Sequence, residues 1–163
     1  LCRQGRMRPK VALFANRAFY GGHLIPVGLP HQTESSEHIS VLLFIFTAGV
    51  GGRVGQDKLF EARIVAGLAA QIYESHRTDF DASRTVGVIT PYRSQIALIK
   101  KDIEALGIPA LKRILVDTVE RFQGSERDVI IYSCCINSYY QLKFVSNLTE
   151  ENAVLIDRKL NVA

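Results

Sequence analysis

The stretch VGVITPYRSQIALIKKDIEAL, residues 86–106, holds a complete strand-to-helix unit. Its first five residues are mostly β-branched, which is typical of a short buried strand. Pro91 favours the start of a helix, in which Ile96, Ile99 and Ile103 recur at three- and four-residue steps on one face. The unit therefore predicts a strand covered by the apolar face of the helix that follows it.

The same alternation of strands and helices continues on both sides of this unit. Towards the amino terminus we expect a helix over residues 9–20, a loop over 23–38 and a strand over 39–47. The last of these is apolar at almost every position, as in a strand buried on both faces of a parallel sheet. Towards the carboxyl terminus we expect strands over residues 114–118 and 129–135.

Two further helices complete the expected pattern. One begins near Leu155, and the other covers residues 57–75, with an apolar face formed by Phe60, Ile64, Gly67, Leu68 and Ile72. Strands interleaved with amphipathic helices predict an α/β fold, with a mostly parallel sheet and helices on both faces. We expect residues 1–163 to form a single domain.

Composition excludes several classes of protein. With 163 residues, 47% hydrophobic and 22% charged, the chain is neither collagen-like, disordered nor a disulfide scaffold. Its longest nearly apolar run, residues 39–50, is shorter than the roughly 20 residues of a membrane span. The odd number of cysteines, Cys2, Cys134 and Cys135, and the adjacency of two of them predict no zinc site and a reducing compartment.

The net charge of +4 is unevenly distributed. All 16 acidic residues lie in residues 34–163, so the first 33 residues are strongly basic. A cluster of this kind can face phosphate, from nucleic acid or from a nucleotide, or it can be a solvated helix entrance. Its members are Arg3, Arg6, Arg8, Lys10 and Arg17.

In parallel sheets the binding crevice lies at the carboxyl ends of the strands, which here predicts residues 47–55, 90–95 and 118–126 along one edge. The glycines of residues 49–55 leave open a dehydrogenase-type nucleotide site, although their spacing is one residue too long for G-x-G-x-x-G. The chain has no Gly-Lys pair, so it lacks the phosphate loop that cleaves nucleoside triphosphates. No metal site is predicted.

The richest segment is VDTVERFQGSERDVII, residues 116–131. Gly124 allows a ligand to approach the backbone, and Glu126 can accept a hydrogen bond from a ribose hydroxyl. A charged connection between two strands explains the same pattern equally well.

This segment also resembles motif V of superfamily 1 helicases, in the branch that includes the nonsense-mediated-decay RNA helicase and a replication helicase. Three other stretches match the family's motifs in the same order: QGRMRP at 4–9 is similar to motif IV, ITPYRSQ at 89–95 to the T-P-Y-x-x-Q turn, and DRKLNVA at 157–163 to the opening of motif VI. Together they identify the chain as resembling the second RecA-like domain of such a helicase, interrupted within motif VI. We therefore expect a fragment of a longer protein.

The resemblance implies a partner domain and a division of labour. In this family ATP lies between two RecA-like domains, the first of which supplies the phosphate loop and holds most of the ATP and Mg²⁺. By resemblance Arg6 is the catalytic contact to the γ-phosphate, and the nucleotide-binding residues are Gln4, Arg6, Gly124, Glu126 and Arg158. Gly5 stands where the family has a base-stacking tyrosine, and Arg8 where it usually has histidine.

The resemblance also implies an ATP-dependent helicase that moves 5′ to 3′ on single-stranded DNA or RNA, in the cytoplasm or the nucleus and not in a membrane. The isolated chain is expected to be inactive, because the phosphate loop and the arginine finger are missing. A non-catalytic binding module from a degenerate helicase is the alternative. The nucleic-acid contacts implied are Thr90, Pro91, Tyr92, Arg93, Gln95 and Thr118.

Overall fold

The computed structural model of the chain describes residues 3–5, 7–33, 43, 45, 56–136, 140–141, 146–151 and 154–157. The glycines of 49–55, the site residues Arg6 and Arg158 and, apart from residues 43 and 45, the expected strand over 39–47 lie outside the described residues. Leu43 and Ile45 are exposed and belong to no strand, so the expectation of a strand buried on both faces was wrong at these two positions. Two compact units are present, which we call the terminal unit and the central unit. The terminal unit is Leu1–Phe46 with Asn147–Asn161, and the central unit is Thr47–Ser146 with Val162–Ala163.

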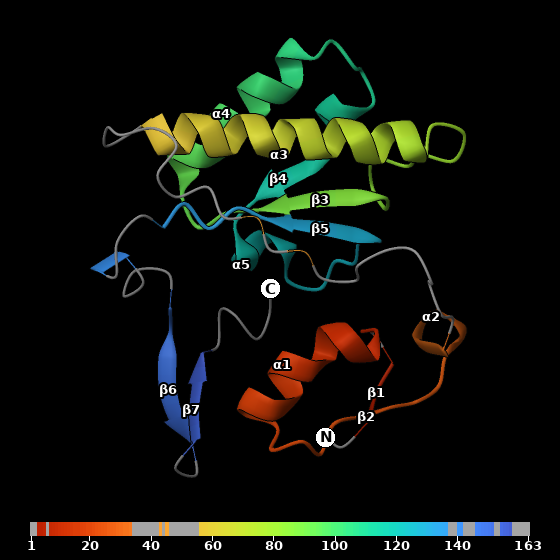
Figure 1. Ribbon diagram of the computed structural model, residues 1–163, viewed down its shortest axis with the longest axis vertical. Helices are drawn as coiled ribbons and strands as arrows, with labels where there is room; N and C mark the ends of the chain where they lie inside the picture. The colour runs from red at the N-terminus through yellow and green to blue at the C-terminus, as the bar shows by residue number, and fades with distance from the viewer. Residues whose placement is uncertain are drawn as a thin grey trace. The chain divides into compact units, whose positions relative to one another are not determined.

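A parallel three-stranded sheet organises the central unit (Figure 1). Its strand order is β4-β3-β5, and β3 is buried at all four positions. The register pairs Val88 with Val116 on one side and with Ile131 on the other. The α/β class and the parallel sheet agree with the expectation from sequence. The elements of this unit are α3 (Gln56–Ser75), β3 (Val86–Ile89), α4 (Arg93–Ala105), η1 (Leu111–Arg113), β4 (Leu115–Asp117), α5 (Val119–Phe122) and β5 (Val129–Tyr132).

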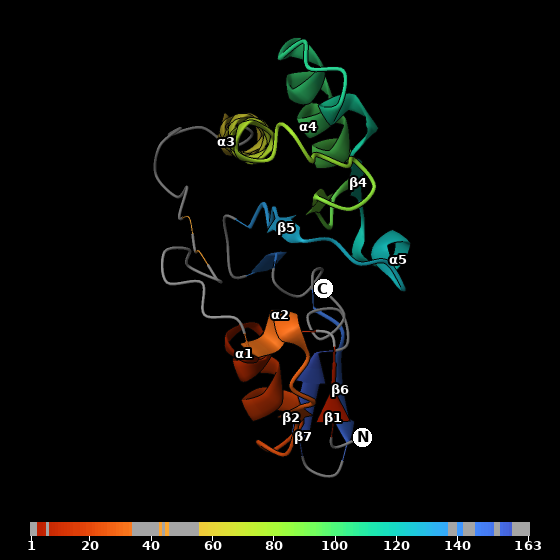
Figure 2. The ribbon, with the colours of Figure 1, turned by 90° about the vertical axis from the view of Figure 1, so that its right-hand side faces the viewer.

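Side chains that alternate along β3 point to opposite faces of this sheet. Val86 and Val88 pack in the main core with α3 and α4, whereas Ile89 packs with Val119 and Phe122 of α5. Helices therefore cover both faces, with α3 and α4 on one side and the short α5 on the other (Figure 2).

Helix α3 buries a different face from the one that its larger side chains indicate. Its fully buried positions are Ala62, Val65, Ala66 and Ala69, while Phe60 is 37% exposed. Small side chains are selected because α3 lies directly against α4 and β3, where there is no room for longer ones. The apolar stripe expected from sequence was therefore wrong for Phe60 and Gly67, which are exposed, whereas Ile72 packs against the core as expected and the helix bounds were right.

The start of α4 also differs from the expectation. The helix begins at Arg93, because Tyr92 has extended backbone angles (φ −113°, ψ 124°) and serves as its N-cap. Pro91 thus lies before the helix, where its fixed φ suits the turn out of β3. At the other end Gly107 adopts φ +69°, a conformation that glycine tolerates best.

Within its described residues the terminal unit contains two small sheets and two helices. A parallel pair joins Arg3 to Ile25, and the Asn16 side chain both donates to Leu24 O (2.9 Å) and accepts from Leu24 N (2.8 Å). The expected loop over 23–38 contains a short strand and a short helix. The elements are β1 (Arg3–Gln4), α1 (Pro9–Phe19), β2 (Ile25–Pro26), α2 (Pro30–Thr33), β6 (Leu148–Glu151) and β7 (Val154–Asp157).

The helix expected near Leu155 is a strand. β7 pairs antiparallel with β6, and Glu150 is the register partner of Leu155. The β-branched residues of 154–157 favour a strand once a partner is present, and the polar sequence of β6 concealed that partner.

Candidate functional site

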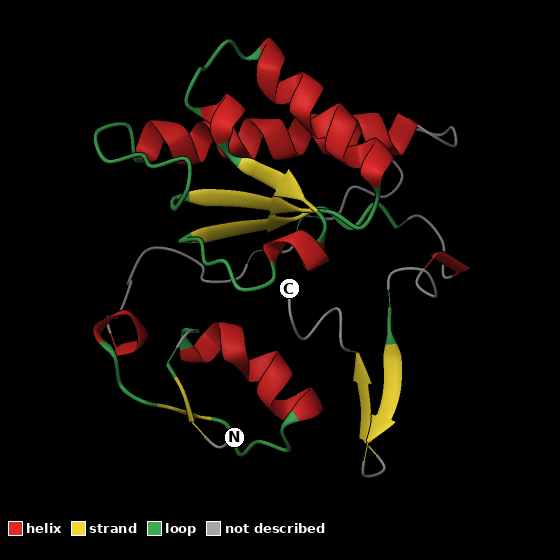
Figure 3. Cartoon of the chain, turned by 180° about the vertical axis from the view of Figure 1, so that it is seen from behind, coloured by secondary structure: helices red, strands yellow, loops and turns green. Residues whose placement is uncertain are grey.

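The carboxyl ends of the three parallel strands meet at one edge of the central unit, toward which the arrowheads point in Figure 3. Two backbone hydrogen bonds continue the ladders past the strand ends: Thr90 N donates to Asp117 O (3.1 Å), and Ser133 N donates to Ile89 O (2.8 Å). The segments that begin at Thr90, Thr118 and Ser133 therefore lie together.

Two expected site residues at this edge are completely buried. Thr90 and Gln95 are each 0% exposed, and the Gln95 Nε2 donates to Lys58 O at 3.1 Å. Among the described residues the Gln95 Oε1 has no hydrogen-bond partner, whereas the Thr90 hydroxyl lies close enough to the Cys135 thiol to influence its pKa. An unpartnered buried polar group costs about 1–3 kcal/mol, so such atoms point to a water or ligand that satisfies them.

The surface above them carries aromatic and cationic groups. Pro91 and Tyr92 are half-buried, and Arg93, the first residue of α4, is exposed. The Lys58 Nζ lies 4.8 Å from the centroid of the Tyr92 ring, within the range of a cation–π interaction. Burial and the neighbouring Cys135 raise the pKa of Tyr92, so its phenol stays protonated at neutral pH.

A carboxylate from α3 fixes the segment after β5. Glu61 Oε1 accepts hydrogen bonds from Ser133 Oγ (2.6 Å) and Cys135 N (3.1 Å). Cys135 has a φ of +52° and is 1% exposed. Burial is the main reason that the pKa of its thiol is raised to about 12.

Thr118 occupies the carboxyl edge as expected. It is half-buried, it is the N-cap residue of α5, and its amide donates to its neighbour Asp117 Oδ1 at 2.8 Å. No hydrogen bond of its hydroxyl caps the helix. Thr118 thus belongs to the same edge as Thr90 and Tyr92.

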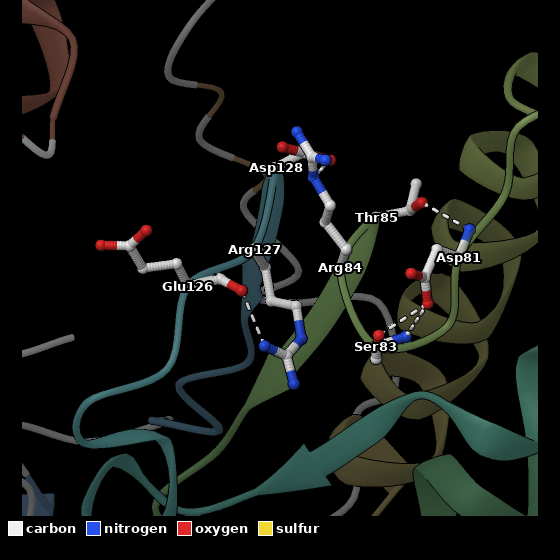
Figure 4. Close-up of polar contacts among 7 residues, drawn as sticks. All are labelled: Asp81, Ser83, Arg84, Thr85, Glu126, Arg127 and Asp128. Atoms are coloured by element: carbon white, nitrogen blue, oxygen red, sulfur yellow. Dashed lines mark hydrogen bonds and ion pairs between the residues drawn. The ribbon is translucent and has the colours of Figure 1, made fainter.

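Glu126 lies instead near the amino ends of the strands, beside the contacts drawn in Figure 4. Asp128 N donates to Arg84 O (2.9 Å), which places residues 126–128 next to the start of β3. A parallel connection must return the chain to the amino edge before the next strand begins. The expectation that all of 118–126 lies along the carboxyl edge was therefore wrong for Glu126.

The Glu126 side chain is exposed. The Arg127 guanidinium donates to Glu126 O at 2.7 Å, and the Glu126 carboxylate is directed away from the Arg84–Asp128 ion pair (Figure 4). Gly124 is exposed and has a φ of +81°. A backbone with this φ strongly favours glycine, which explains why a glycine occupies this position of the motif.

Gln4, in the terminal unit, uses its amide to fold the chain locally. Its Nε2 donates to Met7 O (2.8 Å), and its Oε1 accepts from Met7 N (2.7 Å). The buried Gln32 adds donations to Gln4 O (3.1 Å) and Met7 O (2.9 Å). These four bonds tie Gln4, Met7 and Gln32 to one another.

Gly5 stands at the position where the family that the sequence resembles has a base-stacking tyrosine. A Cβ added there would lie 3.2 Å from Leu29 Cδ1 and 3.3 Å from Val27 Cγ2. These contacts are tight, so the neighbouring side chains fill the space into which a larger residue would extend.

Lys58, Glu61 and Ser133 were not predicted as site residues. Lys58 and Glu61 are one turn apart at the start of α3, and their partners are distant in sequence.

Within the described part of the chain, no group of three or more His, Cys, Asp or Glu side chains could hold a metal ion, and no helix is long and apolar enough to cross a membrane.

The relatives found by comparison with known proteins and named below are all described as helicases. Residues 1–163 match the family described as AAA domain. The mouse 5′-3′ DNA helicase ZGRF1 is 31% identical over 135 residues, and the mouse probable helicase senataxin is 29% identical over 167 residues, or 80% and 98% of this chain. The fission yeast ATP-dependent helicase upf1 is 27% identical over 98% of it. The chain spans only 7%, 6% and 18% of these relatives.

Proposed function

Because the chain belongs to the AAA domain family and is a domain of superfamily 1 helicase type, we propose that it is the second RecA-like domain of an ATP-dependent helicase. In this proposal the domain comprises residues 1–163, closes on ATP and holds single-stranded DNA or RNA. The observation that carries the proposal is the carboxyl edge, where the buried Gln95 Oε1 has no partner among the described residues and belongs to the same helix as the exposed Arg93. The setting would be the cytoplasm or the nucleus.

The strand would cross the surface formed by Pro91, Tyr92, Arg93 and Thr118. Arg93 supplies a charged donor in the first turn of α4, where unpaired backbone amides also favour phosphate. The buried side-chain oxygen of Gln95 would gain a partner from a water that accompanies the strand. Contacts of this type hold a strand through its backbone without reading its sequence.

The nucleotide would be bound by Gln4, Arg6, Gly124, Glu126 and Arg158, opposite a first RecA-like domain that supplies the phosphate loop and the Mg²⁺ ligands. Arg6 would neutralise the γ-phosphate as charge develops during transfer. The hydrogen bonds between Gln4 and Met7 support the proposal, because they hold these two described residues of the motif together. Closure of the two domains would couple hydrolysis to movement.

A 5′-to-3′ direction is part of the proposal, and the name of one relative carries that direction. Gly5 favours a second candidate, a binding module that does not turn over ATP, because glycine has no side chain that could stack on a base. Strand displacement by the longer protein on 5′-tailed and 3′-tailed duplexes tests both. Unwinding of 5′-tailed duplexes alone supports the helicase, and strand binding without unwinding supports the module.

Arg93→Ala tests the strand site directly. We expect weaker binding of fluorescein-labelled single-stranded RNA and DNA, and a salt dependence of log K that is shallower by about 0.7, the value for one lost contact to a single strand. Fluorescence anisotropy between low and moderate salt measures both quantities.

Lys101→Ala provides the matched control, because Lys101 is an exposed cation on the same helix, two turns further along. It removes the same charge and is expected to leave the salt dependence unchanged. The proposal fails if the unaltered chain does not bind single strands, or if the two variants behave alike.

A further inference from the structure

Two residues of the expected strand site contact Lys58: Gln95 bonds to its backbone, and Tyr92 contacts its side chain. Lys58 is the third residue of α3, and its carbonyl oxygen accepts the Gln95 amide at 3.1 Å. Its ammonium group lies 4.8 Å from the centre of the Tyr92 ring. We propose that Lys58 is a phosphate-binding residue of the single-strand surface and that Tyr92 holds its ammonium group in place. This inference rests on the proposed function.

The charge on Lys58 is available to a ligand. No ion pair of Lys58 occurs among the described residues, whereas Arg77, Arg84 and Lys112 each pair with a carboxylate there. Glu61, the acid one turn further along α3, accepts hydrogen bonds from Ser133 and from the backbone of Cys135. Glu61 is thus committed to the segment after β5 rather than to Lys58.

The contact with Tyr92 leaves the ammonium group able to bind phosphate. A ring face attracts the positive charge but offers no lone pair, so the three N–H donors of Lys58 can still bond to phosphate oxygens. The Tyr92 ring contacts one cation, the Lys58 ammonium group. A second cation, Arg93, is the next residue in the sequence.

The unpartnered Gln95 Oε1 is an independent indication of a ligand at this place. It belongs to the same amide group whose Nε2 bonds to Lys58 O, so it lies close to the backbone of Lys58. An acceptor that is buried beside the Lys58 backbone suits a water that accompanies a bound strand, while the Lys58 ammonium group can bind the phosphates of that strand. This second observation separates the site from a lysine that merely covers a helix end.

Salt titration of single-strand binding by the 163-residue chain tests the proposal. Lys58→Ala should weaken binding of a labelled oligonucleotide at low salt and make the dependence of log K on log salt shallower by about 0.7. Lys58→Arg should keep the slope, because it preserves the charge. Lys101→Ala should leave both quantities unchanged, and circular dichroism confirms that each variant is folded.

Changes at Tyr92 test how Lys58 is positioned. Tyr92→Phe keeps the ring and should keep affinity, whereas Tyr92→Leu should weaken binding. The Tyr92→Leu change should cost little more in a chain that already carries Lys58→Ala, because both changes remove the same contact.

The outcomes separate this inference from the proposed function. If the unaltered chain does not bind single strands, the proposed function fails. If it binds, and Arg93→Ala reduces the slope while a folded Lys58→Ala does not, Lys58 is no phosphate contact and the inference is overturned. Independent effects of Tyr92→Leu and Lys58→Ala would overturn the positioning role of Tyr92.

Discussion

Cys135 makes the stability of the central unit sensitive to alkaline pH. Burial raises the pKa of its thiol from the ordinary 9.0 to about 12, so the folded chain keeps a proton that the unfolded chain releases over this range. This contribution to stability is complete below about pH 9 and is lost as the pH rises towards 12. We expect the free energy of unfolding to fall by up to about 1.4 kcal/mol per pH unit above pH 9. Urea unfolding between pH 7.5 and 10.5 measures it.

Cys135→Ala is the informative variant for this prediction. It lowers the stability at neutral pH through lost packing, but it should flatten the alkaline decline. The raised pKa values of Cys134 and Tyr92 act in the same direction, so a shallower decline remains. An unchanged decline in Cys135→Ala would show that its thiol does not hold the proton.

Single residues also show what the sequence could predict about the site. The T-P-Y-x-x-Q segment and Thr118 lie at the carboxyl edge because each directly follows a strand, which a local pattern reveals. Lys58 and Glu61 reach their partners across 34 and 72 positions, and no local pattern encodes such contacts. The burial of Thr90 and Gln95 likewise depends on how α3 packs, which their polar character conceals.

At the scale of elements, the contact between β3 and α5 depends on the absence of a side chain at Gly87. A Cβ there would lie 2.6 Å from Phe122 Cε1 and 2.9 Å from Phe122 Cζ, closer than atoms pack. We expect Gly87→Ala to lower the free energy of unfolding by about 1–3 kcal/mol, the usual range for overpacking. Urea denaturation measures the loss, and Phe122→Leu in the same chain should restore part of it.

Gly67→Ala is the matched control for this prediction. Gly67 is exposed within α3, and a Cβ added there meets no atom within 4 Å. Alanine is the better helix former, so we expect a gain of about 0.5–1 kcal/mol. Equal losses in both variants would contradict the role of the Phe122 contact.

The elements themselves were largely predictable, with two instructive exceptions. α1, α3, β3, β4 and β5 were found close to their expected positions, because caps, periodicity and β-branched runs are local signals. The buried face of α3 was missed because large apolar residues were favoured over alanines. β7 was missed because its partner β6 carries Thr149 and Glu150, which conceal a strand.

At the scale of the whole molecule, the chain contains one part of the catalytic machinery that we propose. It has no Gly-Lys pair from which a phosphate loop could be built. We therefore expect the 163-residue chain alone to release no phosphate from ATP above the buffer rate, with or without single-stranded RNA. A malachite green assay measures the release, with the longer protein that includes the first domain as the positive control.

Only one positive result in this phosphate-release assay would contradict the expected inactivity of the 163-residue chain. Strand-stimulated turnover by the 163-residue chain that disappears in Arg6→Ala would show that the site is complete without a second domain. Turnover that survives Arg6→Ala would come from a contaminant and would leave the expected inactivity intact.

The alanine face of α3 has a mechanical consequence. Small side chains interdigitate little with their neighbours. The buried face of α3 therefore offers weak resistance to a movement of the helix along its own axis. Its first two turns are instead tied by the Gln95 bond to Lys58 O and by the two bonds that Glu61 accepts. Tension applied through a strand gripped at Lys58 would therefore pass into the central unit through these few hydrogen bonds, the shortest of which joins Ser133 to Glu61, one turn beyond Lys58.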